Sequence, residues 1–583
     1  MMIKRLAGCI REYKLPSILS PLFIGLEVIV ECIIPFITAN LINEIEAGAS
    51  LAQIAKYGGM LVLMALLSLS CGALAGHFCA IASSGFGKNL RRDLFTAVQS
   101  FSFSNIDKFS TSSLVTRLTT DVTNLQNAYM MLIRGAIRSP FMVVFALTMA
   151  FRMNPRMSTI FVGVVPVLAV GLFLITKNAM PIFKRVFKKY DALNNSVQEN
   201  VKGMRVVKAF VREDYEEKKF AAASDEVKND FTGAEKLLAL NAPLMQFCAN
   251  SITLCVSYFG AKLIIGTNEQ AMQVGQLSGL ITYGMQILMS LMMLSMTFVM
   301  ITMAIEAGRR VCEVLDEKPS IVSPENAVTE VPNGSIDFTD VYFKYSEKAE
   351  TPALADINLH IKSGQTVGVI GGTGSSKTTL IQLISRLYDV SGGSVCVGGI
   401  DVRQYDLDTL RKEVSVVLQK NVLFSGTIKE NLRWGKMDAT EEEMVAACKS
   451  ACADEFIRSF PDGYDTFIEQ GGTNVSGGQR QRLCIARALI SKPKILVLDD
   501  STSAVDTKTD AQIRKAFRED IPNTTKIIIA QRISSVQDAD MIVVLDGGKI
   551  SAIGTHEQLL ANNDIYKEVY YSQNKAGEQN GRS

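Results

Sequence analysis

Six long apolar segments in the first half of this 583-residue chain constrain its fold more than any other feature. They lie at about 16–42, 54–85, 131–152, 157–178, 239–265 and 274–305. Each is long enough to cross a bilayer as a helix, and hydrocarbon forces a spanning chain to satisfy its backbone hydrogen bonds internally. The sequence therefore predicts an α-helical transmembrane domain of six helices over residues 1–315 and a soluble part after it.

Charge indicates the orientation of these helices. Two charged stretches, each about fifty residues long, separate the second segment from the third and the fourth from the fifth. They are rich in Lys and Arg, whereas the loops at 43–50 and 266–274 contain neither. Arg152 and Arg156, in the short third-to-fourth connection, are the exceptions to this pattern. The bias places the N-terminus and the long extensions in the cytoplasm.

Composition excludes some functions. A net charge of +2 gives no reason to expect nucleic-acid binding. The 11 cysteines show no CxxC spacing, which favours buried free thiols over a metal site or disulfides. The first apolar segment carries Glu27 and Glu31 and no small-residue cleavage site, so we expect a retained membrane helix rather than a cleaved signal.

The first candidate functional motif in the soluble part is a glycine-rich turn. The stretch GGTGSSKTT joins a strand-like run, Thr366 to Ile370, to a helix-like run, Thr378 to Leu387. Its residues are Gly371, Gly372, Thr373, Gly374, Ser375, Ser376, Lys377, Thr378 and Thr379. Backbone N–H groups of such a turn bind phosphate oxygens, the lysine reaches the outer phosphates, and the hydroxyl after it can ligate Mg²⁺. This is a Walker A motif, except that Ser376 replaces the usual glycine before the lysine.

Further motifs follow in order: VVLQ ending at Gln419, NVSGGQRQR at Asn474 to Arg482, and ILVLDDSTSAVD at Ile495 to Asp506. Together with the Walker A motif they resemble the ATP-binding cassette of ABC transporters, and the whole chain resembles an exporter-type half-transporter. The resemblance implies an α/β P-loop cassette with a helical subdomain over 333–575. The polar, proline-punctuated stretch before the cassette indicates a linker at 316–332, and the polar end of the chain indicates a disordered tail at 576–583.

The resemblance also assigns roles to residues. Tyr345 is expected to stack on adenine. Thr378, Gln419 and, through water, Asp499 are expected to hold Mg²⁺. The signature residues are Ser476, Gly477, Gly478 and Gln479. The Walker B motif ends at Asp499, and the SAVD sequence, Ser503 to Asp506, corresponds to the D-loop. ATP and Mg are therefore the implied cofactors.

Two residues depart from the family pattern. The catalytic glutamate after the Walker B aspartate is replaced by Asp500, and Gln531 stands where the switch histidine belongs. Together with Ser376, these two residues are expected to surround the γ-phosphate of ATP. The signature motif, by contrast, is intact. The chain therefore resembles the degenerate subunit of a bacterial heterodimeric multidrug exporter, whose partner has the missing Glu and His. The alternatives are neutral substitutions in an active enzyme, a homodimeric exporter of lipid or peptide, and a nucleotide-responsive membrane sensor.

Two patches look like the intracellular loops of ABC exporters, LVTRLTTDV at Leu114 to Val122 and GMRVVKAF at Gly203 to Phe210. In that family the loop tips are short helices that dock onto the cassettes. We expect the first tip near Ser104 to Phe109 and the second near Glu213 to Glu217. The alternative is that both patches are ordinary charged helices.

The membrane segments carry candidate substrate residues. One face of the sixth segment carries a row of methionines: Met285, Met289, Met292, Met296, Met300 and Met303. Their flexible thioethers suit varied apolar ligands. Packing or lipid contact is the alternative. Glu27 and Glu31 share a face of the first segment, where carboxylates usually face a cavity or pair with a basic group. We favour a cavity for amphipathic, cationic compounds within a lipid bilayer.

Overall fold

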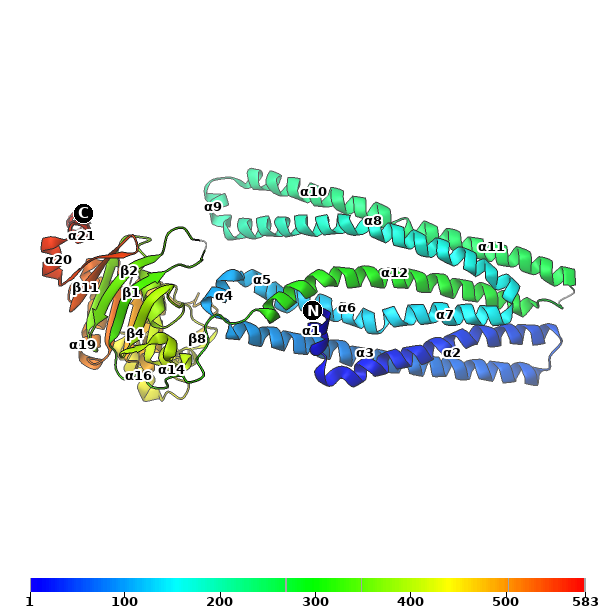
Figure 1. The fold of residues 1–583 in the computed structure, drawn as a ribbon, viewed down its shortest axis with the longest axis horizontal. Coiled ribbons are helices and arrows are strands. Elements are labelled where there is room, and N and C mark those ends of the chain that lie inside the picture. Colours follow the sequence, from blue (N-terminus) through cyan, green and yellow to red (C-terminus); the bar gives the residue numbers. More distant parts are fainter. Residues whose placement is uncertain (1, 268–269, 348, 502, 581–583) are drawn as a thin grey trace. The chain divides into compact units, whose positions relative to one another are not determined.

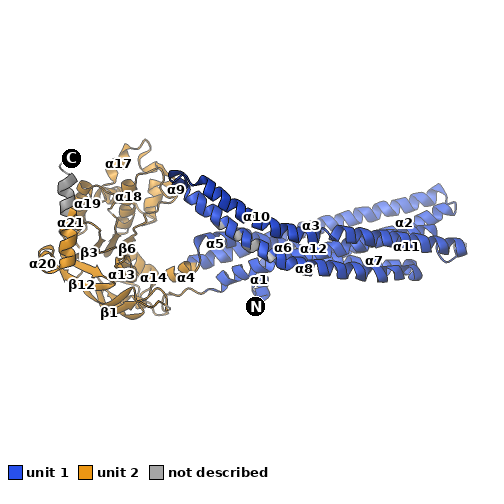
Figure 2. Cartoon of the chain, turned by 90° about the horizontal axis from the view of Figure 1, so that it is seen from above, with its two compact units in different colours: residues 1–99, 110–317 blue, residues 100–109, 318–583 orange. Residues whose placement is uncertain are grey.

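The computed structural model describes residues 2–267, 270–347, 349–501 and 503–580. The chain forms two compact units. Unit 1 comprises residues 1–99 and 110–317, and unit 2 comprises residues 100–109 and 318–583 (Figure 2). A short piece of the membrane half, residues 100–109, thus belongs to the C-terminal unit.

Unit 1 is entirely helical in the part that is described (Figure 1). Its helices are α1 (Met2–Gly8), η1 (Arg11–Tyr13), α2 (Lys14–Glu46), α3 (Leu51–Ser100), α5 (Thr111–Thr116), η2 (Arg117–Asp121), α6 (Val122–Ile133), α7 (Gly135–Met153), α8 (Pro155–Lys202), α9 (Met204–Ala209), α10 (Glu213–Leu238), α11 (Asn241–Thr267) and α12 (Val274–Asp316).

In the part of unit 1 that the structure describes, six helical stretches are long and apolar enough to cross a membrane, which confirms the predicted number. The helices also extend far beyond the apolar segments. The 50 residues of α3 span about 75 Å, more than twice the thickness of a bilayer's hydrocarbon core. A helix of this length therefore extends well beyond the hydrocarbon core of a bilayer.

The core of unit 1 surrounds α12, which packs against α2, α7, α8 and α11. Tyr283 of α12 is fully buried and donates a 2.6 Å hydrogen bond to the Cys32 carbonyl of α2. Gly279 and Gly284 allow the close approach: a Cβ on Gly284 would lie 2.7 Å from Ile252. Small residues let membrane helices pack closely where no hydrophobic force drives them together.

The described residues of unit 2 form three sheets. Four strands are ordered β2-β1-β4-β5, six are ordered β12-β11-β3-β10-β9-β6, and β7 pairs with β8. The strands are β1 (Ile336–Phe343), β2 (Leu354–Ile361), β3 (Thr366–Gly371), β4 (Gly392–Val397), β5 (Ile400–Asp401), β6 (Val414–Val417), β7 (Gly426–Thr427), β8 (Phe467–Ile468), β9 (Ile495–Asp499), β10 (Thr525–Ile529), β11 (Met541–Asp546) and β12 (Lys549–Gly554). The central sheet is parallel except for β12, which is the pattern of an α/β domain.

Helices cover the sheets of unit 2. They are α13 (Lys377–Ile384), η3 (Val402–Gln404), α14 (Leu407–Glu413), α15 (Ile428–Arg433), α16 (Glu441–Ser450), α17 (Asp454–Ser459), η4 (Gly463–Asp465), α18 (Gly477–Ile490), α19 (Thr507–Asp520), η5 (Ile533–Ser535), α20 (His556–Asn562) and α21 (Asp564–Asn580). The tail at 576–583 was expected to be disordered, but residues 576–580 form the end of α21, and residues 581–583 lie outside the described residues.

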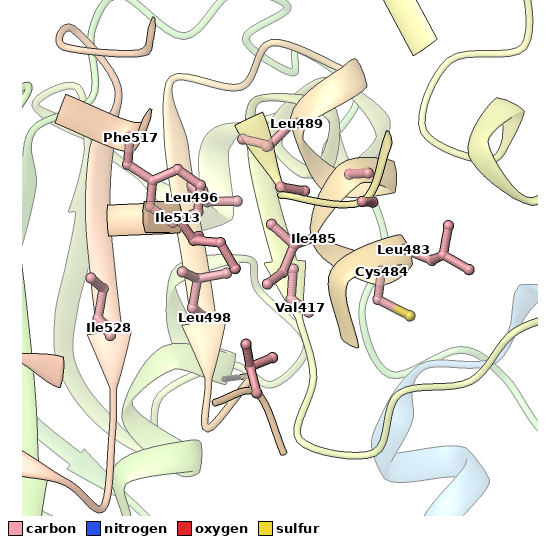
Figure 3. Packing of buried hydrophobic residues seen from close by; sticks show 14 of the residues in the cluster. Val417, Leu483, Cys484, Ile485, Leu489, Leu496, Leu498, Ile513, Phe517 and Ile528 are labelled. Carbon is pink, nitrogen blue, oxygen red and sulfur yellow. The ribbon is translucent and has the colours of Figure 1, made fainter. Parts of the chain in front are cut away.

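The central strands are buried on both faces. Ile485 of α18 and Phe517 of α19 pack on one face against Leu498 and Ile528 (Figure 3). On the other face, Val497 of β9 belongs to a second cluster with residues of α13 and of the four-stranded sheet. This double burial holds the carboxyl ends of β3 and β9 in place, and both ends carry nucleotide motifs.

The segment 100–109 forms a short helix, α4 (Phe103–Lys108), within unit 2. Tyr388 donates a 2.6 Å hydrogen bond to Asp107, and the Phe103 ring lies edge-on to Tyr388 at 6.1 Å. Asn105 donates to the Lys318 carbonyl at 3.0 Å. The first loop tip thus lies one residue from its expected start, and it contacts the cassette side.

The second tip was placed wrongly. Glu213 to Glu217 forms the first turns of the long helix α10, whereas the short helix is α9, inside the GMRVVKAF patch. Glu213, Asp214 and Glu216 occupy the first turn of α10, where acidic side chains favour a helix N-terminus. The acidic run marks the start of a helix rather than a loop tip.

Candidate nucleotide-binding site

The phosphate loop joins β3 to α13, as the sequence predicts. Gly371 lies so close to the Leu545 carbonyl of β11 that a Cβ would clash with it. Gly374 has φ of +83°, and a Cβ there would meet no atom within 4 Å. The first glycine is therefore required by packing, and the second by its backbone conformation.

Ser376 occupies a left-handed conformation, with φ of 69° and ψ of 26°, at the N-cap of α13. This region costs an L-residue with a Cβ about 1 kcal/mol, whereas glycine enters it freely. The Ser376 side chain makes no capping hydrogen bond to the helix. The replacement therefore adds backbone strain as well as a side chain beside the phosphate position.

The Lys377 side chain folds back against the phosphate loop. Its Nζ donates to the carbonyls of Gly371 and Gly372 at 2.9 and 2.7 Å. Partial burial lowers the pKa of this ammonium, while Asp499 and Asp500 oppose that shift. These carbonyl contacts hold the charge over the loop, where anionic phosphates would replace them.

Thr378 and Asp499 form the oxygen-rich part of the site. The Thr378 hydroxyl donates a 2.9 Å hydrogen bond to Asp499 Oδ2, and Asp499 is 2% exposed. Burial raises the pKa of Asp499, partly offset by this hydrogen bond. Hard oxygen donors beside a cluster of carboxylates suit Mg²⁺, which keeps several waters and needs few protein ligands. Among the described residues, no group of three or more His, Cys, Asp or Glu is placed to hold a metal by itself.

Asp500 and Gln531 lie in direct contact. Gln531 Nε2 donates a 2.8 Å hydrogen bond to Asp500 Oδ2. Burial raises the pKa of Asp500, and hydrogen bonds from Gln419 and Gln531 oppose the rise. The backbone carbonyl of Gln531 in turn accepts a 2.7 Å hydrogen bond from the side-chain amide of Gln573 in α21. The structure therefore brings together the two residues that depart from the family pattern.

Tyr345 lies beside the start of α13. Its hydroxyl shares a 2.9 Å hydrogen bond with Thr379, and its ring lies edge-on to Tyr388 at 5.3 Å. The side chain is 53% exposed, so part of its ring faces solvent. A half-exposed ring at this position is free to stack on a base.

The signature begins α18. Ser476 and Gln479 form a reciprocal capping box, with bonds of 2.9 Å and 3.2 Å between each side chain and the other's backbone. Gly478 permits contact with the Ala504 carbonyl, to which a Cβ would come within 2.9 Å. Gln481 accepts a 3.0 Å bond from the Ala504 amide. The signature turn and the D-loop are therefore one hydrogen-bonded assembly.

Two family models match the chain: the ABC transporter transmembrane region over residues 17–291 and the ABC transporter domain over residues 354–503. An uncharacterized ABC transporter ATP-binding protein of Mycobacterium tuberculosis is 35% identical over 98% of this chain and 96% of its own length. The chain belongs to the ABC transporter family. Another uncharacterized ABC transporter ATP-binding protein, from Bacillus subtilis, is 34% identical over 97% of both chains.

The fold has a solved counterpart. A bacterial Atm1-family ABC exporter with ATP bound superposes with a TM-score of 0.81 at 24% identity, covering 97% of this chain and 98% of the other. This ABC transporter chain is thus a multi-pass membrane protein with a cytoplasmic nucleotide-binding domain, and ATP is its nucleotide.

The candidate substrate residues lie in unit 1. Arg138 of α7, which the sequence analysis missed, donates to Glu27 at 2.5 Å and to Glu31 at 2.7 Å. Its position inside the apolar segment 131–152 is the sequence feature that could have indicated a partner for the two carboxylates. Met289, Met292 and Met296 are exposed on α12, while Met285 packs against the core. The substrate role of these residues stays a prediction.

Proposed function

We propose that this chain is the degenerate half of a heterodimeric ABC exporter. The observation that carries this proposal is the 2.8 Å hydrogen bond from Gln531 to Asp500. ATP hydrolysis requires a carboxylate that orients the attacking water and a group that contacts the γ-phosphate. Here the shorter carboxylate and the amide that replaces the histidine are bonded to each other.

The geometry disfavours fast hydrolysis at this chain's own Walker motifs. Aspartate withdraws the carboxylate by about an ångström relative to glutamate, and a displacement of that size costs about a hundredfold in rate. An amide also cannot supply the imidazole contact of the switch histidine. ATP would be held by Lys377 and the loop amides, with Mg²⁺ near Thr378, Gln419 and Asp499, and hydrolysed slowly.

The signature supports the second half of the proposal. Its capping box and its bonds to the D-loop are complete. In this family each ATP is sandwiched between one chain's Walker motifs and the other chain's signature. A chain with a weakened Walker side and an intact signature suits a partner that carries the catalytic glutamate and the switch histidine.

We further propose that the cargo is an amphipathic, cationic compound moved outward. Glu27 and Glu31 share a single guanidinium, so the cluster has one negative charge in excess when all three groups are ionised. Carboxylates at membrane depth are costly and usually mark a functional path. The exposed methionines of α12 supply a polarizable apolar surface for such a cargo.

Native mass spectrometry of the tagged chain, purified in mild detergent from its own host, tests the assembly. A complex with a second, different chain of similar size is expected. A complex of two identical copies would overturn the heterodimer and make Asp500 a working catalytic residue. Reconstitution of the purified complex in vesicles with ATP and a fluorescent cation then tests transport, because a sensor or regulator would move nothing.

The substrate class is tested with Glu27→Gln/Glu31→Gln/Arg138→Gln, which removes the whole charge cluster without leaving an unpaired ion. Export of cationic dyes is expected to fall while export of neutral dyes is retained. Glu46→Gln, an exposed position at the outer end of α2, is the control. Equal losses for both dye classes would contradict the cationic assignment.

A further inference from the structure

A cavity of about 530 Å³ lies between the outer ends of α8 and α11. Arg156 and Ile160 line it from α8, and Phe259, Lys262 and Leu263 line it from α11. Figure 1 shows α11 running beside α8, and the two helices are in contact. The cavity lies where α8 begins and α11 ends, far along both helices from the cytoplasmic helix α9, so it opens at the outer face of the membrane.

Within the described ranges, the two cations of this cavity have no acidic partner. No hydrogen bond or ion pair joins the Arg156 or Lys262 side chain to any other residue in the described ranges. Arg156 also runs against the bias that keeps basic residues cytoplasmic. Both side chains are exposed at this cavity, and an anion bound there would be attracted by both charges.

The walls of the cavity are apolar as well as basic. Phe259 is about half exposed, and Leu263 and Ile160 are partly exposed next to it. Arginine binds phosphate through a planar fork, and lysine binds it as a point charge. A ligand that satisfies both features has an anionic head and an apolar body, and a cavity of this volume is of the size that holds such a head group.

We propose that this cavity binds an anionic phospholipid of the outer leaflet. Its phosphate lies between Arg156 and Lys262, and its acyl chains run along Ile160, Phe259 and Leu263. The site is separate from the nucleotide motifs and from the Arg138 cluster, so the proposal does not depend on the proposed export function.

Native mass spectrometry of the full-length chain, with any copurifying partner, tests the site after exchange into nanodiscs of phosphatidylglycerol or of phosphatidylcholine. We expect phosphatidylglycerol to remain bound when detergent is stripped, and phosphatidylcholine to be lost. Arg156→Gln/Lys262→Gln is expected to weaken phosphatidylglycerol retention roughly thirtyfold, since each cation near the membrane surface contributes about 1 kcal/mol.

Two control variants test whether lipid retention depends on the charges of this cavity. Arg152→Gln removes a neighbouring arginine that does not line the cavity and is expected to retain the lipid. Arg156→Lys/Lys262→Arg keeps both charges and is expected to restore retention, which separates loss of charge from misfolding. Equal retention of both lipids, or equal retention by wild type and the Gln variant, would overturn the proposal. Displacement of the lipid by millimolar inorganic phosphate would instead identify a site for a soluble anion.

Discussion

Gln531 donates a 2.8 Å hydrogen bond to Asp500, so the side chain in the position of the switch histidine holds the one in the position of the catalytic glutamate. Residues in direct contact give substitution effects that do not add. The two departures from the family pattern therefore form one coupled unit, and their effects on hydrolysis have to be measured together as well as singly.

Restoring both residues is expected to restore hydrolysis. Asp500→Glu/Gln531→His lengthens the carboxylate and supplies an imidazole, and the ATPase rate of this chain's own site is expected to rise about a hundredfold. Each single change is expected to give much less, because Gln531 would still engage the longer carboxylate, or Asp500 would still be too short. The measurement is steady-state Mg-ATPase of the purified complex after the partner's Walker A lysine is replaced.

The control for this prediction is Gln537→His, which adds an imidazole at an exposed position nearby. It is expected to leave the rate unchanged. A double variant as slow as the wild-type chain would show that Asp500 and Gln531 do not limit hydrolysis.

Replacing Ser376 with glycine is expected to stabilise unit 2. The backbone at Ser376 has φ of 69°, and removing the Cβ relieves about 1 kcal/mol of strain. A fluorescent ATP analogue is also expected to bind more tightly, because the loop can then approach the phosphates. Thermal unfolding and analogue titration measure the two effects.

Ser375→Gly is the matched control, since Ser375 is buried and its backbone is not left-handed. This change is expected to destabilise unit 2 by about 0.5 to 1 kcal/mol through loss of backbone restriction. Destabilisation by both glycine variants would contradict the strain at Ser376.

Tyr388→Phe is expected to loosen α4 from the rest of unit 2. The change removes the 2.6 Å bond to Asp107 and leaves that carboxylate without this donor, at a cost of about 1.5 to 3 kcal/mol. Hydrogen exchange of residues 103–108 is expected to accelerate roughly tenfold or more. Tyr342→Phe, on an exposed tyrosine of β1, is expected to change nothing.

The effect of Tyr388→Phe is also expected to be independent of pH between about 6 and 9. Burial and the Asp107 carboxylate raise the pKa of Tyr388 above its usual value near 10. A raised pKa keeps the phenol protonated, and its contribution is lost only when the pH rises toward that pKa. An exchange difference that disappears at pH 9 would contradict this assignment.

Removing Arg138 alone is expected to destabilise unit 1 strongly. Arg138→Gln leaves Glu27 and Glu31 without their guanidinium inside the membrane segments, where an unpaired carboxylate is costly. Removal of all three charges is expected to recover most of that loss. Thermal melting in detergent, followed by size-exclusion chromatography, compares the single and triple variants; equal melting points would show that the pairing contributes little.

The nucleotide residues were accessible to sequence analysis because their spacing follows from local geometry. A strand, a glycine-rich turn and a helix bring Gly371, Lys377 and Thr378 together within a few residues. The parallel pairing of β9 with β10 brings Asp500 beside Gln531, although the two are 31 residues apart. Their mutual hydrogen bond was not predictable, since it depends on side-chain conformation.

Other features of the fold and the site could be identified only from the three-dimensional structure. The strain at Ser376 is a backbone property, and the residue type alone indicated only an added side chain. Arg138 became a partner of Glu27 and Glu31 through packing of α7 on α2, a contact between helices about 110 residues apart. The second loop tip was placed wrongly because the short helix α9 forms within the GMRVVKAF patch itself, whereas the acidic residues after it begin α10.

The first helix of the chain is fastened by the last turn of α12. Arg5 donates to the Leu315 carbonyl at 3.1 Å and pairs with Asp316 at 3.4 Å, across 310 residues of sequence. At a synthesis rate of about 5 to 20 residues per second, α1 waits roughly 15 to 60 seconds for these partners to be made. Throughout that interval the ribosome is still attached, and Arg5 has neither of these two partners in α12.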